Sequence, residues 1–139
     1  KGFSRAMWHE KARNTLKAVD VVFCDPDNGL RIKSVTHGSS RSDKYVTADE
    51  LVSYYTDGKS VIFYNHRCRE QESIYLQRFD SLKHDHRLTS AKWIGLKFNR
   101  GTVRDYLFIL QPKHVEKVSG AVTEMMKGNW KRHFSMLDL

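Results

Sequence analysis

The stretch that decides the fold reads Val21-Val22-Phe23-Cys24-Asp25-Pro26-Asp27-Asn28-Gly29-Leu30. Its four leading apolar residues predict a strand buried on both faces, as in a parallel sheet that is covered by helices. The strand is expected to end at Asp25, because proline supplies no backbone donor and Asp-Asn-Gly is a strong turn signal. Two carboxylates and a carboxamide should therefore lie at the carboxyl end of a strand, where ligands bind in open α/β sheets.

A second apolar strand is predicted at Val61-Ile62-Phe63-Tyr64. The helix between the two strands begins at a capping box, Thr47-Ala48-Asp49-Glu50, and ends at Gly58. A strand, a helix and a further strand form a βαβ unit, in which the crossover is right-handed and the strands are parallel. We therefore expect the carboxyl ends of both strands at one edge of the sheet.

The polar residues that follow these two strands form one candidate catalytic site. Its members are Asp25, Pro26, Asp27, Asn28, Asn65 and His66. A carboxylate beside a turn that proline stiffens is a pre-positioned hydrogen-bond acceptor. The same carboxylate and carboxamide can instead serve only to cap the turn and satisfy amides of the loop. Both interpretations stay open from the residues alone.

The remaining elements are predicted from periodicity and turn residues. Helices are expected at about residues 4–17, 70–83 and 114–127, the first capped by Ser4 and with Arg5 available for solvent. Strands at about residues 91–98 and 106–110 should form an antiparallel hairpin. The predicted fold class is α/β: a Rossmann-like, mostly parallel sheet with flanking helices and a C-terminal antiparallel hairpin.

The length of the chain fits one α/β domain, residues 1–139. The chain has no initiating Met, and its first helix leads directly into a strand expected at the centre of the sheet. We therefore expect that an amino-terminal portion is missing and that the domain is the second half of a larger fold. The sequence does not indicate an oligomeric state.

Neither the cysteines nor the histidines form a recognisable metal motif. Cys24 and Cys68 are far apart and are interpreted as the reduced thiols of a cytoplasmic protein. His84-Asp85-His86 ends a predicted helix without a clear third ligand, so no metal site is assigned there. No apolar run approaches the length of a membrane span, so no membrane partner is expected.

The net charge of +8 favours an anionic partner, most often nucleic acid, although a solvated basic surface gives the same balance. Residues 31–45 are too polar for a core and predict a surface loop, or alternatively a mobile lid beside the site. The candidate phosphate contacts follow the two strand ends. They are Arg31, Lys33, Arg41, Lys44, Arg67 and Arg69.

The order of elements, with Asp25-Pro26-Asp27-Asn28 after the first strand, resembles the second half of a class I S-adenosylmethionine-dependent methyltransferase. It is most similar to the bacterial ribosomal RNA adenine-N6 methyltransferases of the J type and their uncharacterised relatives, which carry Asp/Asn-Pro-Pro-Tyr/Phe there. The resemblance implies that the acid and a neighbouring carbonyl accept hydrogen bonds from the target amine, which orients its lone pair. It also implies that the aromatic residue stacks on the base.

This chain departs from that motif, because Asp27 replaces the second proline and Asn28 replaces the aromatic residue. A stacking group would then have to come from Tyr45, Tyr64 or His37. The implied cofactor is S-adenosylmethionine, but the glycine-rich loop and ribose-binding acid belong to the family's first half. No G-x-G-x-x-G pattern occurs here, so the cofactor-binding residues are unknown.

Three functions are compatible with these residues. The first is a methyltransferase-like protein that acts on an exocyclic amine of nucleic acid, such as adenine in RNA or DNA. The second is a magnesium-dependent nuclease or phosphoesterase, with Asp25 and Asp27 on the ion and His66 as general base. Lys33 or Arg67 would stabilise the phosphate in that case. The third is a non-catalytic nucleic-acid-binding module.

Overall fold

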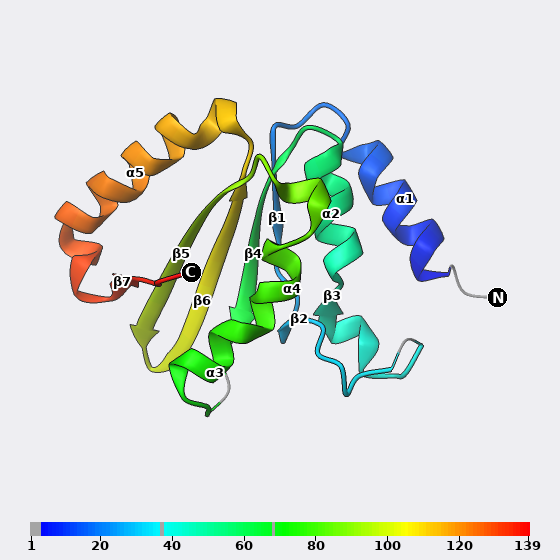
Figure 1. Ribbon diagram of the computed structural model, residues 1–139, viewed down its shortest axis with the longest axis horizontal. Coiled ribbons are helices and arrows are strands. Elements are labelled where there is room, and N and C mark those ends of the chain that lie inside the picture. Colours follow the sequence, from blue (N-terminus) through cyan, green and yellow to red (C-terminus); the bar gives the residue numbers. More distant parts are fainter. Residues whose placement is uncertain (1–3, 37, 68) are drawn as a thin grey trace.

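The computed structural model describes residues 4–36, 38–67 and 69–139; His37 and Cys68, both considered above, lie outside the described residues. The fold is mixed α/β, as predicted, with one five-stranded sheet and flanking helices (Figure 1). Across this sheet the strands follow in the order β1 (Val21–Cys24), β4 (Ser60–His66), β6 (Thr102–Leu110), β5 (Lys92–Arg100) and β7 (Phe134–Met136).

The directions of the strands confirm the predicted βαβ unit and hairpin. β1 and β4 are parallel, with Val22 opposite Val61. β6 lies between β4 and β5 and is antiparallel to both, so β5 runs in the same direction as β1 and β4. The hairpin strands are longer than predicted and turn at Gly101, whose φ of +77° suits glycine. β7 adds a short antiparallel strand beside β5.

The helices are α1 (Arg5–Thr15), α2 (Ala48–Thr56), α3 (Glu72–Leu76), α4 (Asp80–Lys83) and α5 (Val115–Lys127). The predicted caps are confirmed: Ser4 accepts a hydrogen bond from Met7 N, and the capping box begins α2. The single helix predicted at residues 70–83 is wrong, because a 3₁₀ turn at Gln77–Phe79 separates α3 from α4. No described helix has the length and apolar character of a membrane span.

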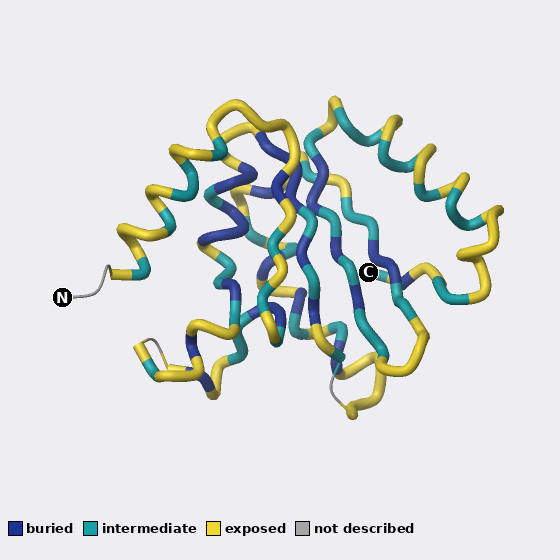
Figure 2. The backbone as a smooth tube through the Cα atoms, turned by 180° about the vertical axis from the view of Figure 1, so that it is seen from behind, coloured by how far each residue is buried: buried dark blue, intermediate teal, exposed yellow. Residues whose placement is uncertain are grey.

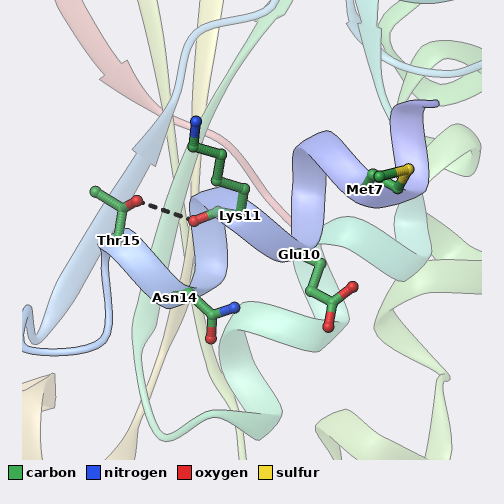
Figure 3. Close-up of a pocket in the computed structure, with 5 residues that line it drawn as sticks. All are labelled: Met7, Glu10, Lys11, Asn14 and Thr15. Carbon is green, nitrogen blue, oxygen red and sulfur yellow. Dashed lines mark hydrogen bonds between the residues drawn. The ribbon is translucent and has the colours of Figure 1, made fainter. Parts of the chain in front are cut away.

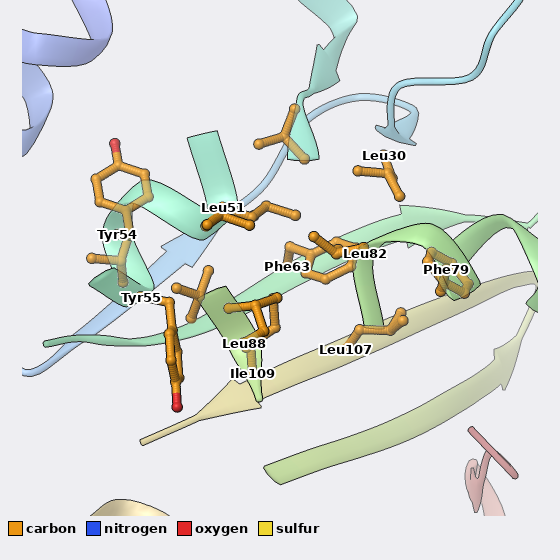
Figure 4. Close-up of a cluster of buried hydrophobic side chains, with 14 of the residues drawn as sticks. Leu30, Leu51, Tyr54, Tyr55, Phe63, Phe79, Leu82, Leu88, Leu107 and Ile109 are labelled. Atoms are coloured by element: carbon orange, nitrogen blue, oxygen red, sulfur yellow. The ribbon is translucent and has the colours of Figure 1, made fainter. Parts of the chain in front are cut away.

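The hydrophobic core lies on one face of the sheet, beneath α2, α3 and α4 (Figure 4). Phe63 on β4 and Leu107 on β6 are fully buried there, against Leu51 of α2 and Phe79 of the 3₁₀ turn. Burial of side chains of this size contributes about 1.5–3 kcal/mol each. This one-sided core holds the crossover helix on the sheet and so fixes the carboxyl ends of β1 and β4.

The opposite face of the sheet is largely uncovered. Seen from behind, β1 and β4 lie between α1 and α5 with neither helix across them (Figure 2). Val22 is buried in the core, but Val21 and Phe23 are exposed. The prediction of a strand buried on both faces is therefore wrong, as is its central place, because β1 is an edge strand of this sheet.

The loop after β1 is tied down at both ends. β2 (Gly29–Leu30) and β3 (Tyr45–Val46) form a separate two-stranded parallel sheet. One residue to either side, Asn28 N donates to the carbonyl of Lys44, and Arg31 N donates to that of Val46. The segment between these contacts is thus a closed loop whose two ends lie side by side near the candidate site.

Candidate functional site

The turn after β1 presents its carboxylates to solvent. Asp25 and Asp27 are exposed, and Pro26 and Asn28 are half-buried. The Asp27 Oδ2 atom lies 3.9 Å from Lys44 Nζ. Asp25 makes no hydrogen bond or ion pair with any residue in the described part of the chain. Its carboxylate is therefore available as an acceptor.

Asn65 lies near the end of β4, and its side chain connects this strand to the turn after β1. Its side chain is buried, its Oδ1 atom accepts a hydrogen bond from Leu30 N at 2.8 Å, and its Nδ2 atom donates to the Tyr75 hydroxyl at 2.6 Å. The two strand ends are therefore adjacent, as their parallel pairing predicted. Asn65 acts on the turn by positioning it and does not face the solvent beside Asp25.

His66 leaves β4 on the uncovered face of the sheet. Its Nδ1 atom lies 3.0 Å from the hydroxyl of Tyr64, and Arg104 of β6 is its partner across the strands. The register that pairs Cys24 with Phe63 places Asp25 beside Tyr64. Partial burial raises the pKa of Tyr64, and the negative charge of Asp25 acts in the same direction. Asp25, Tyr64 and His66 thus form one polar group at this edge.

Arg67 is engaged inside the fold. Its guanidinium lies over the Tyr75 ring, 4.6 Å from the centroid, and pairs with Glu72. Its Nε and Nη2 atoms both donate to Asp105 Oδ2, at 3.0 and 2.9 Å. Asp105 is fully buried, and this burial raises the pKa of its carboxyl despite the nearby guanidinium. The Arg67 side chain is only 9% exposed and is committed to Asp105 and Glu72, so it does not fit the predicted role of a phosphate contact.

The other predicted basic residues remain accessible. Lys33, Arg41, Lys44 and Arg69 are exposed, and Arg31 is half-buried. Figure 1 shows that the β2–β3 pair and the beginning of α3 lie at the edge where β1 and β4 end. Printed contacts place two of these cations at this edge: Lys44 lies 3.9 Å from Asp27, and the backbone of Arg31 binds the carbonyl of Val46.

A cleft of about 600 Å³ opens between α1 and β1 and reaches the candidate site. Asp25 and Pro26 form part of its wall. The rest comes from α1, β1, β3 and α2, with the aromatic residues Trp8, Phe23, Tyr45 and Tyr54 among the lining side chains. A volume of this size is typical of small-molecule and cofactor sites. Sequence patterns did not indicate that α1 would contribute to the site.

Arg5 fastens α1 to this cleft, which corrects the expectation that it faces solvent. Its Nε and Nη2 atoms donate to Glu50 at 2.6 and 2.8 Å. Nη1 donates to the carbonyl of Ser42 and Nη2 to that of Tyr45. One guanidinium thereby joins α1, the loop and α2. No local signal reveals this contact, because Arg5 and Glu50 lie 45 residues apart.

A second hollow lies on the outer side of α1, where Met7, Glu10, Lys11, Asn14 and Thr15 surround it (Figure 3). All five side chains come from this one helix, and the Thr15 hydroxyl donates back to the Lys11 carbonyl. The hollow is therefore a feature of a solvent-facing helix surface. It brings no residues together from different parts of the chain.

The described residues contain no group of three or more His, Cys, Asp and Glu side chains placed to hold a metal ion. In the candidate motif at residues 84–86, His84 Nδ1 lies 2.7 Å from the carbonyl of Asp80. Asp85 binds the guanidinium of Arg87, which lowers the pKa of its carboxyl to about 2. These side chains have structural partners of their own.

Comparisons with known proteins leave the function to be inferred from this geometry: no protein-family model, no curated protein and no solved structure matches the chain.

Proposed function

We propose that this chain is methyltransferase-like and holds an exocyclic amine of nucleic acid at the Asp25-Pro26-Asp27-Asn28 turn. One observation carries the proposal. The carboxylate of Asp25 is exposed, makes no hydrogen bond or ion pair with a described residue, and lies in the wall of the cleft between α1 and β1. A carboxylate in that place can accept a hydrogen bond from the N–H groups of an amine. Such a bond would direct the lone pair of the amine nitrogen into the cleft.

The arrangement of the strands supports the finer fold that this proposal requires. β1, β4 and β5 run in one direction, with β6 as the antiparallel strand between β4 and β5. A Rossmann-like sheet of the methyltransferase kind is likewise parallel apart from one antiparallel strand near its carboxyl end. The short antiparallel strand β7 departs from that scheme. We propose that this sheet corresponds to the second half of such a fold.

The residues around Asp25 fit the amine better than they fit S-adenosylmethionine. The only buried acid among the residues that line the cleft, Glu50, binds Arg5 and Thr47 N and cannot also hold a ribose. The sequence contains no glycine-rich fingerprint for a nucleotide. The residues around Asp25 therefore account for holding the amine and not for binding the methyl donor.

The basic edge supports a nucleic-acid substrate. Lys33, Arg41, Lys44 and Arg69 are exposed, Lys44 lies 3.9 Å from Asp27 of the turn, and the chain carries a net charge of +8. Cations around a site position phosphates without reading sequence. The proposal includes a cytoplasmic location, in keeping with Cys24, which is a free thiol.

A non-catalytic nucleic-acid-binding module is the second candidate, favoured by the poor fit of the cleft to a nucleotide donor. Nothing in the described geometry favours the nuclease. Asp27 lies near Lys44, His66 bonds with Tyr64, and no third acid approaches them in the described residues. Salt-sensitive binding without turnover is the result expected of the second candidate.

Transfer of a labelled methyl group from S-adenosylmethionine to RNA or DNA tests the proposal. We expect incorporation when this chain is joined to the first half of the proposed fold, which would hold the donor, and we expect it to fall about a hundredfold in Asp25→Ala. Asp20→Ala is the matched control, because Asp20 is an exposed acid at the other end of β1 and pairs with Lys113 there. Absence of both methyl incorporation and a thermal shift at millimolar donor would show that the proposal is wrong.

A further inference from the structure

Trp8 is exposed in the cleft whose wall also includes Asp25. The Trp8 side chain does not serve to pack α1 against the rest of the protein. Trp8 is 58% exposed, and α1 buries none of its residues. The helix is held by polar contacts: Arg5 to Glu50, His9 to Ser53, and Arg13 to Asp57. The exposed indole lines the cleft that Asp25 also lines, so it is available to a ligand bound there.

The cleft contains aromatic surface on which a planar ligand can stack. Trp8 supplies exposed aromatic surface, and Pro26 lines the same space. Tyr54 also lines the cleft but is buried, and the ring of Phe23 stacks on Tyr106. Indole is the side chain whose flat surface best accepts a stacked base, and base stacking is tolerant of sequence because every base has a π-face. Stacking alone would therefore not select among the bases.

The polar groups in the cleft provide the selectivity. Glu50 is bound by Arg5, and His9 Nε2 lies 2.7 Å from Ser53 Oγ. Asp25 is left as an acceptor without a described hydrogen-bond partner. A carboxylate accepts hydrogen bonds only, so it favours a ligand edge with an N–H donor and disfavours a carbonyl edge.

We propose that a base with an exocyclic amine stacks on Trp8 and donates its amine hydrogens to Asp25. Trp8 takes the place of the aromatic residue that Asn28 lacks. The occupant is a single-stranded segment, because a base paired in a duplex presents neither a free face nor a free amine. This inference rests on the proposed function for the identity of the amine, but it makes no use of methyl transfer.

The test compares two probes that differ only at the amine. One is a short single-stranded oligouridine with a central adenine, and the other carries unsubstituted purine there, with hydrogen in place of the amine. We expect the full chain to bind the adenine probe about tenfold more tightly, as for a hydrogen bond to a charged group. In Asp25→Ala the two affinities should become equal.

Stacking is tested through Trp8 itself. In a Trp130→Phe background, which leaves Trp8 and the partly buried Trp93, the adenine probe should quench the tryptophan fluorescence, and Trp8→Leu should abolish this quenching. Trp8→Leu should bind about tenfold more weakly, and Trp8→Phe should retain most of the affinity, because leucine keeps apolar area but has no π-face. Trp130→Phe alone should bind like the wild type. Circular dichroism of each variant checks that it folds.

Several outcomes would overturn the inference. These are equal binding of the two probes by the wild-type chain, full affinity in Trp8→Leu, or tighter binding of the duplex form. Equal affinity of Trp8→Leu and Trp8→Phe for the adenine probe would likewise show that the base does not stack on this side chain. The proposed function fails separately: an adenine preference without methyl transfer supports this inference alone, whereas methyl transfer without quenching supports only the proposed function.

Discussion

The side chain of Asn65 and the backbone of Leu30 join the ends of two parallel strands: Asn65 Oδ1 accepts a hydrogen bond from Leu30 N at 2.8 Å. The Asn65 carboxamide can come this close to the backbone because the neighbouring residue, Gly29, has no side chain. A Cβ atom at Gly29 would lie 2.0 Å from Asn65 Oδ1, and the φ of +99° is one that side chains rarely adopt. The turn that carries Asp25 therefore depends on this glycine.

Gly29→Ala should destabilise the protein by about 2–4 kcal/mol, from the left-handed backbone together with the clash. Urea denaturation measures this loss. Gly101→Ala is the matched control, because its φ is also positive at +77° but a Cβ there meets nothing within 4 Å. It should cost only about 1 kcal/mol. Equal losses in the two variants would mean that the contact with Asn65 is unimportant.

Arg67→Met should destabilise the fold by about 3–5 kcal/mol, because it leaves the fully buried Asp105 carboxylate without its cation. The double variant Arg67→Met/Asp105→Leu should regain most of that loss, since no buried charge then remains. Arg78→Met removes the more exposed pair with Glu70 and should cost no more than about 1 kcal/mol. Chemical denaturation curves separate these cases, and a fully stable Arg67→Met would contradict the structural role of Arg67.

Arg5→Gln should release α1 from the cleft. Glu50 and the carbonyls of Ser42 and Tyr45 would lose their donor, and α1 buries no residue of its own to hold it in place. We expect amide hydrogen exchange in α1 to become about tenfold faster or more, while the strands stay protected. Arg13→Gln, which breaks the exposed pair with Asp57, should change exchange much less. Unchanged exchange in Arg5→Gln would refute the anchoring role.

Stability should fall on acidification through His9. Burial lowers the pKa of this imidazole below its ordinary value of 6.5, so the unfolded chain binds the proton more readily than the folded chain does. The contribution is present above pH 6.5 and is lost as the pH falls through the folded pKa. The melting temperature of the wild type should drop between about pH 7.5 and 5.5 more than that of His9→Gln, which can still bond with Ser53 but does not titrate. Parallel curves would exclude His9 as the cause.

Local patterns predicted much of the fold because their physics is local. The capping box at Thr47 and Glu50 and the cap at Ser4 are set by hydrogen bonds within one helical turn. The apolar runs of β1 and β4 and the short turn at Gly101 likewise indicated a parallel pair and a hairpin, which the structure confirms. The same runs could not show that Val21 and Phe23 are exposed, because the covering of a sheet face depends on distant elements.

The sequence by itself determined that Asp25 stands at the carboxyl end of a strand and that Asn65 ends the neighbouring parallel strand. It did so because a change from apolar to turn-forming residues marks a strand end whatever surrounds it. Only the tertiary structure decided that Asn65 is buried under Gly29, that Arg67 is committed to Asp105, and that Trp8 shares a cleft with Asp25. These relationships join residues far apart in the chain, and only packing brings such residues together.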